Sequence, residues 1–139
     1  MTTARETFAL YAKALADGDN VTAAGCFTED GALEFPYWPL LGLTDRYQGH
    51  EALEAYLGKL LQLVPGFAFT EMAVHIDTPE AMFAEFTVDL PTSTGRRFNF
   101  HYGNLVLVED GKIKVLREFI DQVPAALALL PGGLADIRG

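Results

Sequence analysis

The residues best suited to chemistry are a histidine and a glutamate late in the chain. His101 and Glu118 lie in two runs rich in aromatic and β-branched residues, 98–108 and 113–121, which an Asp-Gly pair connects. Because Asp and Gly accept the positive φ angles of a tight turn, this pattern predicts a β-hairpin. A carboxyl group and an imidazole held together on such a hairpin could move protons to and from a substrate.

The turn also predicts the register of the hairpin. With the Asp-Gly pair as a two-residue loop, Gly103 lies opposite Glu118 and His101 lies opposite Ile120. His101 and Glu118 then share one strand face with Leu116, as diagonal neighbours about 7–8 Å apart. The alternative is that both side chains point to solvent or form structural ion pairs.

The other face of this hairpin is too apolar to be left in water. It carries Phe98, Phe100, Tyr102, Val106, Val108, Ile113, Val115 and Phe119. Both faces must therefore be covered. We expect helices on one face and a second sheet or a second subunit on the other.

Composition limits the classes of function. The chain has 139 residues, 50% of them hydrophobic, and a formal net charge of −9. These values predict one globular domain over residues 1–139 and disfavour nucleic-acid binding, since a phosphate backbone would be repelled. No apolar run reaches the ~20 residues of a membrane span, and the first residues lack the apolar stretch of a signal peptide. We expect a soluble, cytoplasmic protein with no membrane partner.

Residue spacing gives little support to metal or nucleophile chemistry. The histidines His50, His75 and His101 lie in different elements, without the spacing of metal ligands. Cys26 is the only cysteine and is expected in the core. The only serine, Ser93, lies in a loop outside any Gly-x-Ser-x-Gly motif. We therefore expect neither a metal nor another cofactor.

The hydrophobic patterns predict an α+β domain. Thr3 and Glu6 form a capping box for a first helix that ends at 17–19, and Asn20 is expected to cap a second helix with Val21, Ala24 and Phe27 buried. A turn over 28–31, a short strand over 32–35, a helix over 50–63, strands over 67–76 and 81–90, the hairpin, and a helical turn over 124–130 are expected to follow. The loop over 36–49 is unusually apolar, with Tyr37 and Trp38. It either packs under a neighbour or lines a ligand cavity.

Several segments resemble the nuclear transport factor 2-like superfamily. They are YAKALADGD over 11–19, FTEDG over 27–31, YQGHEAL over 47–53, and DGKI with REF over 110–119. Within the superfamily the chain is most similar to SnoaL-like cyclases, ketosteroid isomerases, limonene epoxide hydrolases and phenazine-biosynthesis A/B proteins. The resemblance implies a cone-shaped, curved antiparallel sheet wrapped around three N-terminal helices, with a deep apolar pocket. It also implies a homodimer through the outer sheet face.

The catalytic residues of these families carry over only in part. Tyr11 matches the oxyanion-hole tyrosine of ketosteroid isomerases, but their general base and second acid fall at Phe35 and Gly103. Glu118 matches the water-activating aspartate of the epoxide hydrolases and a glutamate of the phenazine proteins. The pocket histidine of the phenazine proteins falls near Tyr56, which the helical pattern also allows as a core residue.

Two hypotheses follow from the residues and the resemblance. The first is a cofactor-independent enzyme that isomerises, cyclises, dehydrates or hydrolyses a small, largely apolar, cyclic metabolite. Glu118 would move the proton, His101 would assist it, and Tyr11 would donate to an oxyanion. The expected substrate-binding wall comprises Trp38, Tyr37, Tyr56, Phe35 and Leu116. The second hypothesis is a non-catalytic module for ligand binding or dimerisation.

Overall fold

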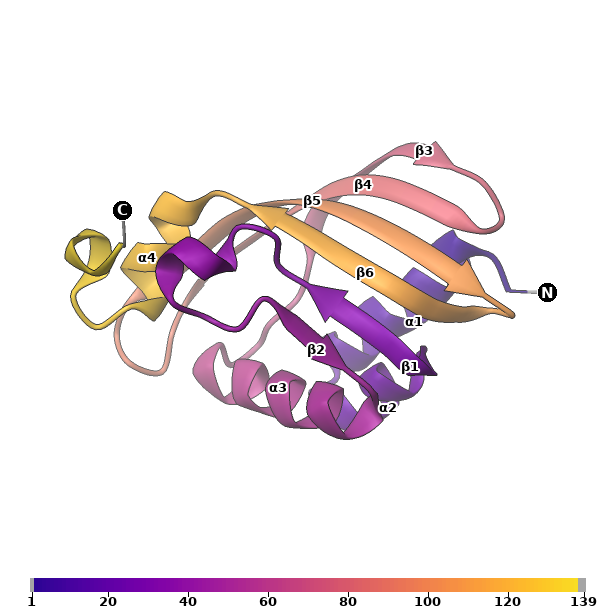
Figure 1. Cartoon of the computed structure of the whole chain (residues 1–139), viewed down its shortest axis with the longest axis horizontal. Helices are drawn as coiled ribbons and strands as arrows, with labels where there is room; N and C mark the ends of the chain where they lie inside the picture. Colours follow the sequence, from indigo (N-terminus) through magenta and orange to yellow (C-terminus); the bar gives the residue numbers. More distant parts are fainter. Residues whose placement is uncertain (1, 138–139) are drawn as a thin grey trace.

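The computed structural model describes residues 2–137, which fold into four α-helices and one six-stranded sheet (Figure 1). The α-helices are α1 (Ala4–Ala16), α2 (Asn20–Gly25), α3 (His50–Leu63) and α4 (Gln122–Leu129), with 3₁₀ turns η1 (Trp38–Leu41) and η2 (Gly133–Asp136). The strands are β1 (Phe27–Glu34), β2 (Arg46–Gln48), β3 (Thr70–Asp77), β4 (Ala81–Pro91), β5 (Arg97–Glu109) and β6 (Lys112–Ile120).

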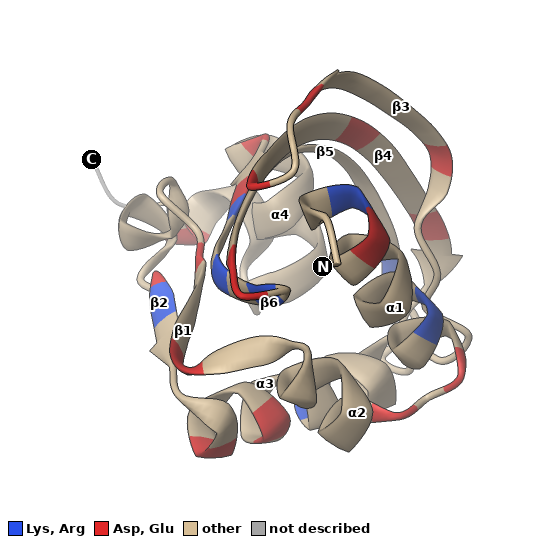
Figure 2. Ribbon diagram, turned by 90° about the vertical axis from the view of Figure 1, so that its right-hand side faces the viewer, with Lys and Arg blue, Asp and Glu red and all other residues tan. Residues whose placement is uncertain are grey.

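The sheet is curved and does not close into a barrel. Its strand order is β2-β1-β6-β5-β4-β3. Figure 2 shows α1 against the concave side, with α2 and α3 across the open side. The predicted α+β fold, a curved sheet around three N-terminal helices, is confirmed. One pairing differs from the all-antiparallel expectation, because β1 runs parallel to β6.

The first two helices begin at side-chain caps. The hydroxyl of Thr3 accepts a hydrogen bond from the backbone N–H of Glu6 at 3.2 Å, as the capping pattern predicts. Asp19, rather than Asn20, caps α2. The expected buried stripe of α2 is wrong at Val21, which is 59% exposed.

The strand β1 begins earlier than the sequence indicated. Phe27 was expected in a helix and residues 28–31 in a turn, but all belong to β1. Phe27 pairs with Ile113 of β6, and the register then shifts before Ala32. Gly31 permits this close approach, because a Cβ there would lie 2.6 Å from the carbonyl oxygen of Ile113. The polar residues of this segment hid its strand character.

The hydrophobic core lies between the helices and the concave face of the sheet. Aromatic rings dominate it: Phe8 of α1 stacks on Phe86 of β4 with ring centroids 5.0 Å apart. On β5, the buried side chains are the even-numbered residues from Phe98 to Val106. This alternation makes one face of β5 the floor of the core. No helix within residues 2–137 is long and apolar enough to cross a membrane.

Candidate functional site

A β-bulge decides which side chains of the β5–β6 hairpin face inward. The Asp-Gly turn forms as predicted, with Glu109 opposite Lys112. Val108 then pairs with Ile113 while Leu107 pairs with Val115, so Lys114 is an extra residue on β6. A bulge of this kind shifts the register by one residue. Every pairing beyond it differs from the prediction.

The shifted register separates His101 from Glu118. Asn104 lies opposite Glu118, where Gly103 was expected. Because a one-residue shift exchanges the faces of a strand, Glu118 turns into the core and is 7% exposed. The His101 side chain is 64% exposed on the convex face. The expected His101–Glu118 pair therefore does not form.

The Glu118 side chain is buried and accepts one side-chain hydrogen bond. Asn104, which is fully buried, donates from Nδ2 to Oε2 of Glu118 at 3.0 Å. Burial raises the pKa of the Glu118 carboxyl to about 7, and the Asn104 hydrogen bond opposes this only in part. The carboxyl group is thus poised to take up or release a proton near neutral pH.

Three tyrosines lie close enough to Glu118 to feel its charge. Burial, and then the nearby Glu118, raise the pKa values of Tyr11, Tyr56 and Tyr102 well above their usual range. Their hydroxyl groups therefore stay protonated at neutral pH. They can donate hydrogen bonds but not act as phenolates.

A cavity of about 250 Å³ opens beside the Glu118 carboxyl. Its buried floor comes from the end of β1, η1, β5 and β6: Phe35, Trp38, Phe98, Phe100, Tyr102, Glu118 and Ile120. Its less buried rim comes from the loop before β2, from β2 itself, and from α3 and α4: Leu43, Tyr47, Tyr56, Lys59, Leu60, Leu63 and Leu129. Half of the lining residues are aromatic. Such a wall suits flat, apolar rings.

Ring packing holds the aromatic wall in place. Phe35 stacks on Trp38 at 5.1 Å with the ring planes 7° apart. Tyr47 stacks on Tyr56 with ring centroids 4.2 Å apart, and Phe35 contacts Tyr56 at 5.6 Å. These rings come from separate elements, so the folded chain positions them before any ligand arrives.

Helix α4 contributes to the rim through an anchor on the β4–β5 loop. The guanidinium group of Arg96 donates to the backbone carbonyls of Leu127, Leu130 and Pro131 at the end of α4. Gln122 donates to the carbonyl oxygen of Tyr37 at 2.9 Å. Leu129 is thereby held at the cavity edge.

The structure brings some of the expected substrate-binding residues together. Phe35, Trp38 and Tyr56 line the cavity. Tyr37 does not: it is 48% exposed and packs on Phe119, with ring centroids 5.9 Å apart. Leu116 is fully buried in the core beyond the cavity wall.

Tyr11 and His101 lie outside the cavity lining. Tyr11 is buried between aromatic rings of the core, with its ring centroid 5.6 Å from that of Phe27. The Nε2 atom of His101 forms a hydrogen bond with Oε1 of Glu85 at 2.6 Å. The Nε2 atom of His75 forms a hydrogen bond with the other carboxylate oxygen, Oε2, at 2.5 Å. These two hydrogen bonds, that of His101 first, lower the pKa of Glu85. His101 thus takes the structural ion-pair alternative.

Sequence reasoning missed most of the cavity lining and, among the polar residues of the site, Asn104, Tyr102 and Lys59. Asn104 and Tyr102 flank the Glu118 carboxyl, and Lys59 stands on the rim. The run of aromatic residues on even positions of β5 was the available signal for Tyr102. No pattern singled out Asn104, because its importance depends on the bulge. Within residues 2–137, no group of three or more His, Cys, Asp or Glu side chains could hold a metal ion.

A family model described as the SnoaL-like domain matches residues 8–116, which is more than half of the chain. The chain belongs to the SnoaL-like domain family. The resemblance to this family inferred from sequence segments is thereby confirmed. No curated protein sequence matches this SnoaL-like chain.

Solved structures share the fold of this SnoaL-like chain. A crystal structure named "Putative Isomerase" from Bacillus subtilis superposes with a TM-score of 0.80 at 24% identity, covering 94% of this chain and 93% of that one. A phenazine biosynthesis-related protein from Pseudomonas aeruginosa has a TM-score of 0.67 at 22% identity, covering 90% and 83%. An LEH-like epoxide hydrolase from M. tuberculosis has a TM-score of 0.67 at 22% identity, covering 95% and 92%.

Proposed function

We propose that this SnoaL-like protein is a cofactor-independent acid–base enzyme for a small, largely apolar, cyclic metabolite. The observation that carries the proposal is Glu118, a carboxyl with a pKa of about 7 on the floor of an aromatic cavity. A base with this pKa combines a deprotonated fraction with useful basicity at neutral pH. Isomerisation or cyclisation through a carbanion or enolate fits this single proton-transfer group best.

The proposed reaction begins when the ionised Glu118 removes a proton from a carbon of the bound substrate. Its Oε2 is held by Asn104, which leaves Oε1 for the substrate. Glu118 then returns the proton to another atom, so no net proton is consumed. Aromatic walls exclude water, which protects the intermediate and keeps the carboxyl basic.

We propose that two tyrosine hydroxyls stabilise negative charge on the substrate. Tyr102 and Tyr56 line the cavity, and both feel the charge of Glu118. As neutral donors they would hydrogen-bond to the oxygen of an enolate. They take the role that the sequence assigned to Tyr11, which packs in the core.

Hydrogen–deuterium exchange of a simple ketone tests the proposal without knowledge of the substrate. 2-Tetralone in D₂O, followed by NMR, should exchange its benzylic α-protons faster with the protein than in buffer alone. Glu118→Gln should reduce this catalysed exchange by ~10²-fold or more, because it removes the base and keeps the shape. The catalysed rate should rise with pH and level off above about 7.

Glu109→Gln is the matched control, since Glu109 is an exposed carboxyl on the same hairpin. It should exchange 2-tetralone like the unchanged protein. Equal loss in both variants, or full activity in Glu118→Gln, contradicts a proton-transfer role for Glu118.

A ligand-binding module remains the second candidate. It is favoured by the convex position of His101, because Glu118 then lacks the histidine partner that the sequence suggested for acid–base chemistry. A binder predicts that Trp38 fluorescence, a cavity reporter, responds to apolar ring compounds while no exchange is catalysed. Glu118→Gln would then alter affinity only.

A further inference from the structure

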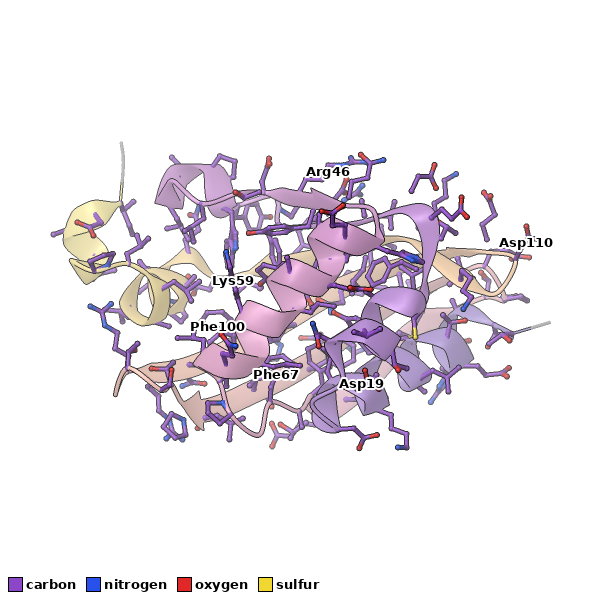
Figure 3. The ribbon with its side chains drawn as sticks, turned by 90° about the horizontal axis from the view of Figure 1, so that it is seen from below. Asp19, Arg46, Lys59, Phe67, Phe100 and Asp110 are labelled. Atoms are coloured by element: carbon purple, nitrogen blue, oxygen red, sulfur yellow. The ribbon has the colours of Figure 1, made fainter. Side chains whose placement is uncertain are left out.

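One basic side chain stands on the cavity rim. Lys59 is the sole basic residue among the described residues that line the cavity, as Glu118 is the sole acidic one. Lys59 shares a face of α3 with Tyr56 and Leu63, which follow the helical spacing and also line the cavity. Figure 3 views the molecule from the α3 side, with Lys59 and Phe100 labelled beside the C-terminal half of this helix.

Lys59 has no acidic partner within residues 2–137. None of the ion pairs there includes it. Its neighbours three and four residues away along α3 are Ala55, Tyr56, Gln62 and Leu63, so no helical carboxylate can reach it either. By contrast, Lys13 pairs with Asp17 at 2.6 Å.

The cavity carries an acidic group on its floor and a basic group on its rim. Glu118 is buried on the floor, whereas Lys59 is exposed on the rim. A lysine can lay its methylene chain along an apolar wall and keep its ammonium group in water. An anionic ligand would be repelled by ionised Glu118 and by the net charge of −9. Among the described residues that line the cavity, only Lys59 would attract it.

We propose that Lys59 binds the anionic group of a ring-containing ligand, most simply a carboxylate, while the rings fill the aromatic part of the cavity. This inference rests on the proposed function and specifies its substrate class: a planar cyclic compound with the anion at the end remote from the reacting carbon. A cavity of about 250 Å³ is slightly smaller than most ligand sites and suits a compound of about two fused rings.

A matched pair of probes separates charge from shape. 2-Naphthoate and 2-naphthamide share the same rings, and only the first carries a negative charge at pH 8. Trp38 is the only tryptophan of the chain and lines the cavity, so quenching of its emission reports occupancy there. Calorimetry on the whole protein gives the two affinities.

We expect 2-naphthoate to bind ~3–10-fold more tightly than 2-naphthamide, since an exposed charge contact is modest and screened by salt. Lys59→Met should abolish this preference, Lys59→Arg should retain it, and 0.5 M NaCl should reduce it. Lys13→Met removes the same charge far from the cavity and should leave the preference unchanged.

Equal affinities in the unchanged protein, or a preference that survives Lys59→Met, overturn the inference. The proposed function is judged separately by ketone exchange and Glu118→Gln. Binding of 2-naphthamide alone would refute the Lys59 site while leaving the aromatic cavity in place. Failure of both probes to quench Trp38 would refute the two-ring substrate class as well.

Discussion

Glu118 shows how burial and a single hydrogen bond set the properties of a carboxyl group. Its ordinary pKa of 4.5 rises to about 7, because the loss of hydration outweighs the donor from Asn104. The other polar atom of that amide, Oδ1, is buried without a hydrogen-bond partner in the described chain. An unpaired buried acceptor costs free energy. Burial of Asn104 and Glu118 therefore lowers the stability of the folded protein while it makes the Glu118 carboxyl more basic.

The raised pKa of Glu118 predicts how stability depends on pH. The folded protein holds this proton more tightly than the unfolded chain, so the stabilising contribution is complete below about 4.5. It is lost as pH rises through about 7. The loss amounts to about 3 kcal/mol in the free energy of unfolding. Urea denaturation between pH 5 and 8 should show this decline in the unchanged protein and a shallower one in Glu118→Gln.

Asn104→Leu provides a second arm of the same measurement. Removing the Nδ2 donor should raise the pKa of Glu118 further, because the hydrogen bond favours the ionised form. The decline in stability would then move to higher pH. An unchanged profile in both variants would contradict the assignment of the raised pKa to Glu118.

At the scale of elements, the parallel pair of β1 and β6 carries the site. β6 holds Glu118, and β1 leads into Phe35 and Trp38 of the cavity wall. The two strands approach closely only because residue 31 is glycine. The bulge at Lys114 lies in β6, the strand that holds Glu118, and turns the Glu118 side chain toward the core.

Gly31→Ala should destabilise the fold by about 1–3 kcal/mol, because the added methyl would overlap the backbone of Ile113 and force the strands apart. Gly25→Ala is the matched control. A Cβ at Gly25 meets no atom within 4 Å, and Ala favours its helix. Thermal and urea unfolding would measure both. Equal stabilities of the two variants would show that β1 and β6 tolerate separation.

At the scale of the molecule, the convex face of the sheet carries a cluster of large apolar side chains. Phe83, Leu105 and Phe119 are half-buried there, with Phe83 and Phe119 on either side of Gly103. Phe83 pairs with Leu105 across β4 and β5. We propose that this face forms a homodimer, and that His101 and Glu85 lie within or beside the contact.

Leu105→Glu should convert the proposed dimer into a monomer, because it places a charge in an apolar contact. Sedimentation velocity at micromolar concentration would show the change in mass. Leu10→Glu is the control, since Leu10 is an exposed leucine on α1. A monomeric unchanged protein would refute the dimer.

Local patterns in the sequence determined the α+β class, the capped first helix and the Asp-Gly turn. These depend on turn chemistry and periodicity, which act over a few residues. The choice of Glu118 as the central carboxyl also came from sequence. Its partners did not.

Only the tertiary structure decided which groups surround Glu118. One extra residue at Lys114 exchanges the faces of β6 relative to β5, so Asn104 and Tyr102 lie beside Glu118 in place of His101. The parallel β1–β6 contact and the burial that raises the pKa of Glu118 likewise arise between distant segments. Sequence periodicity shows that side chains alternate between the two faces of a strand. It does not show which residues face the core after a bulge, because packing of the whole sheet decides that.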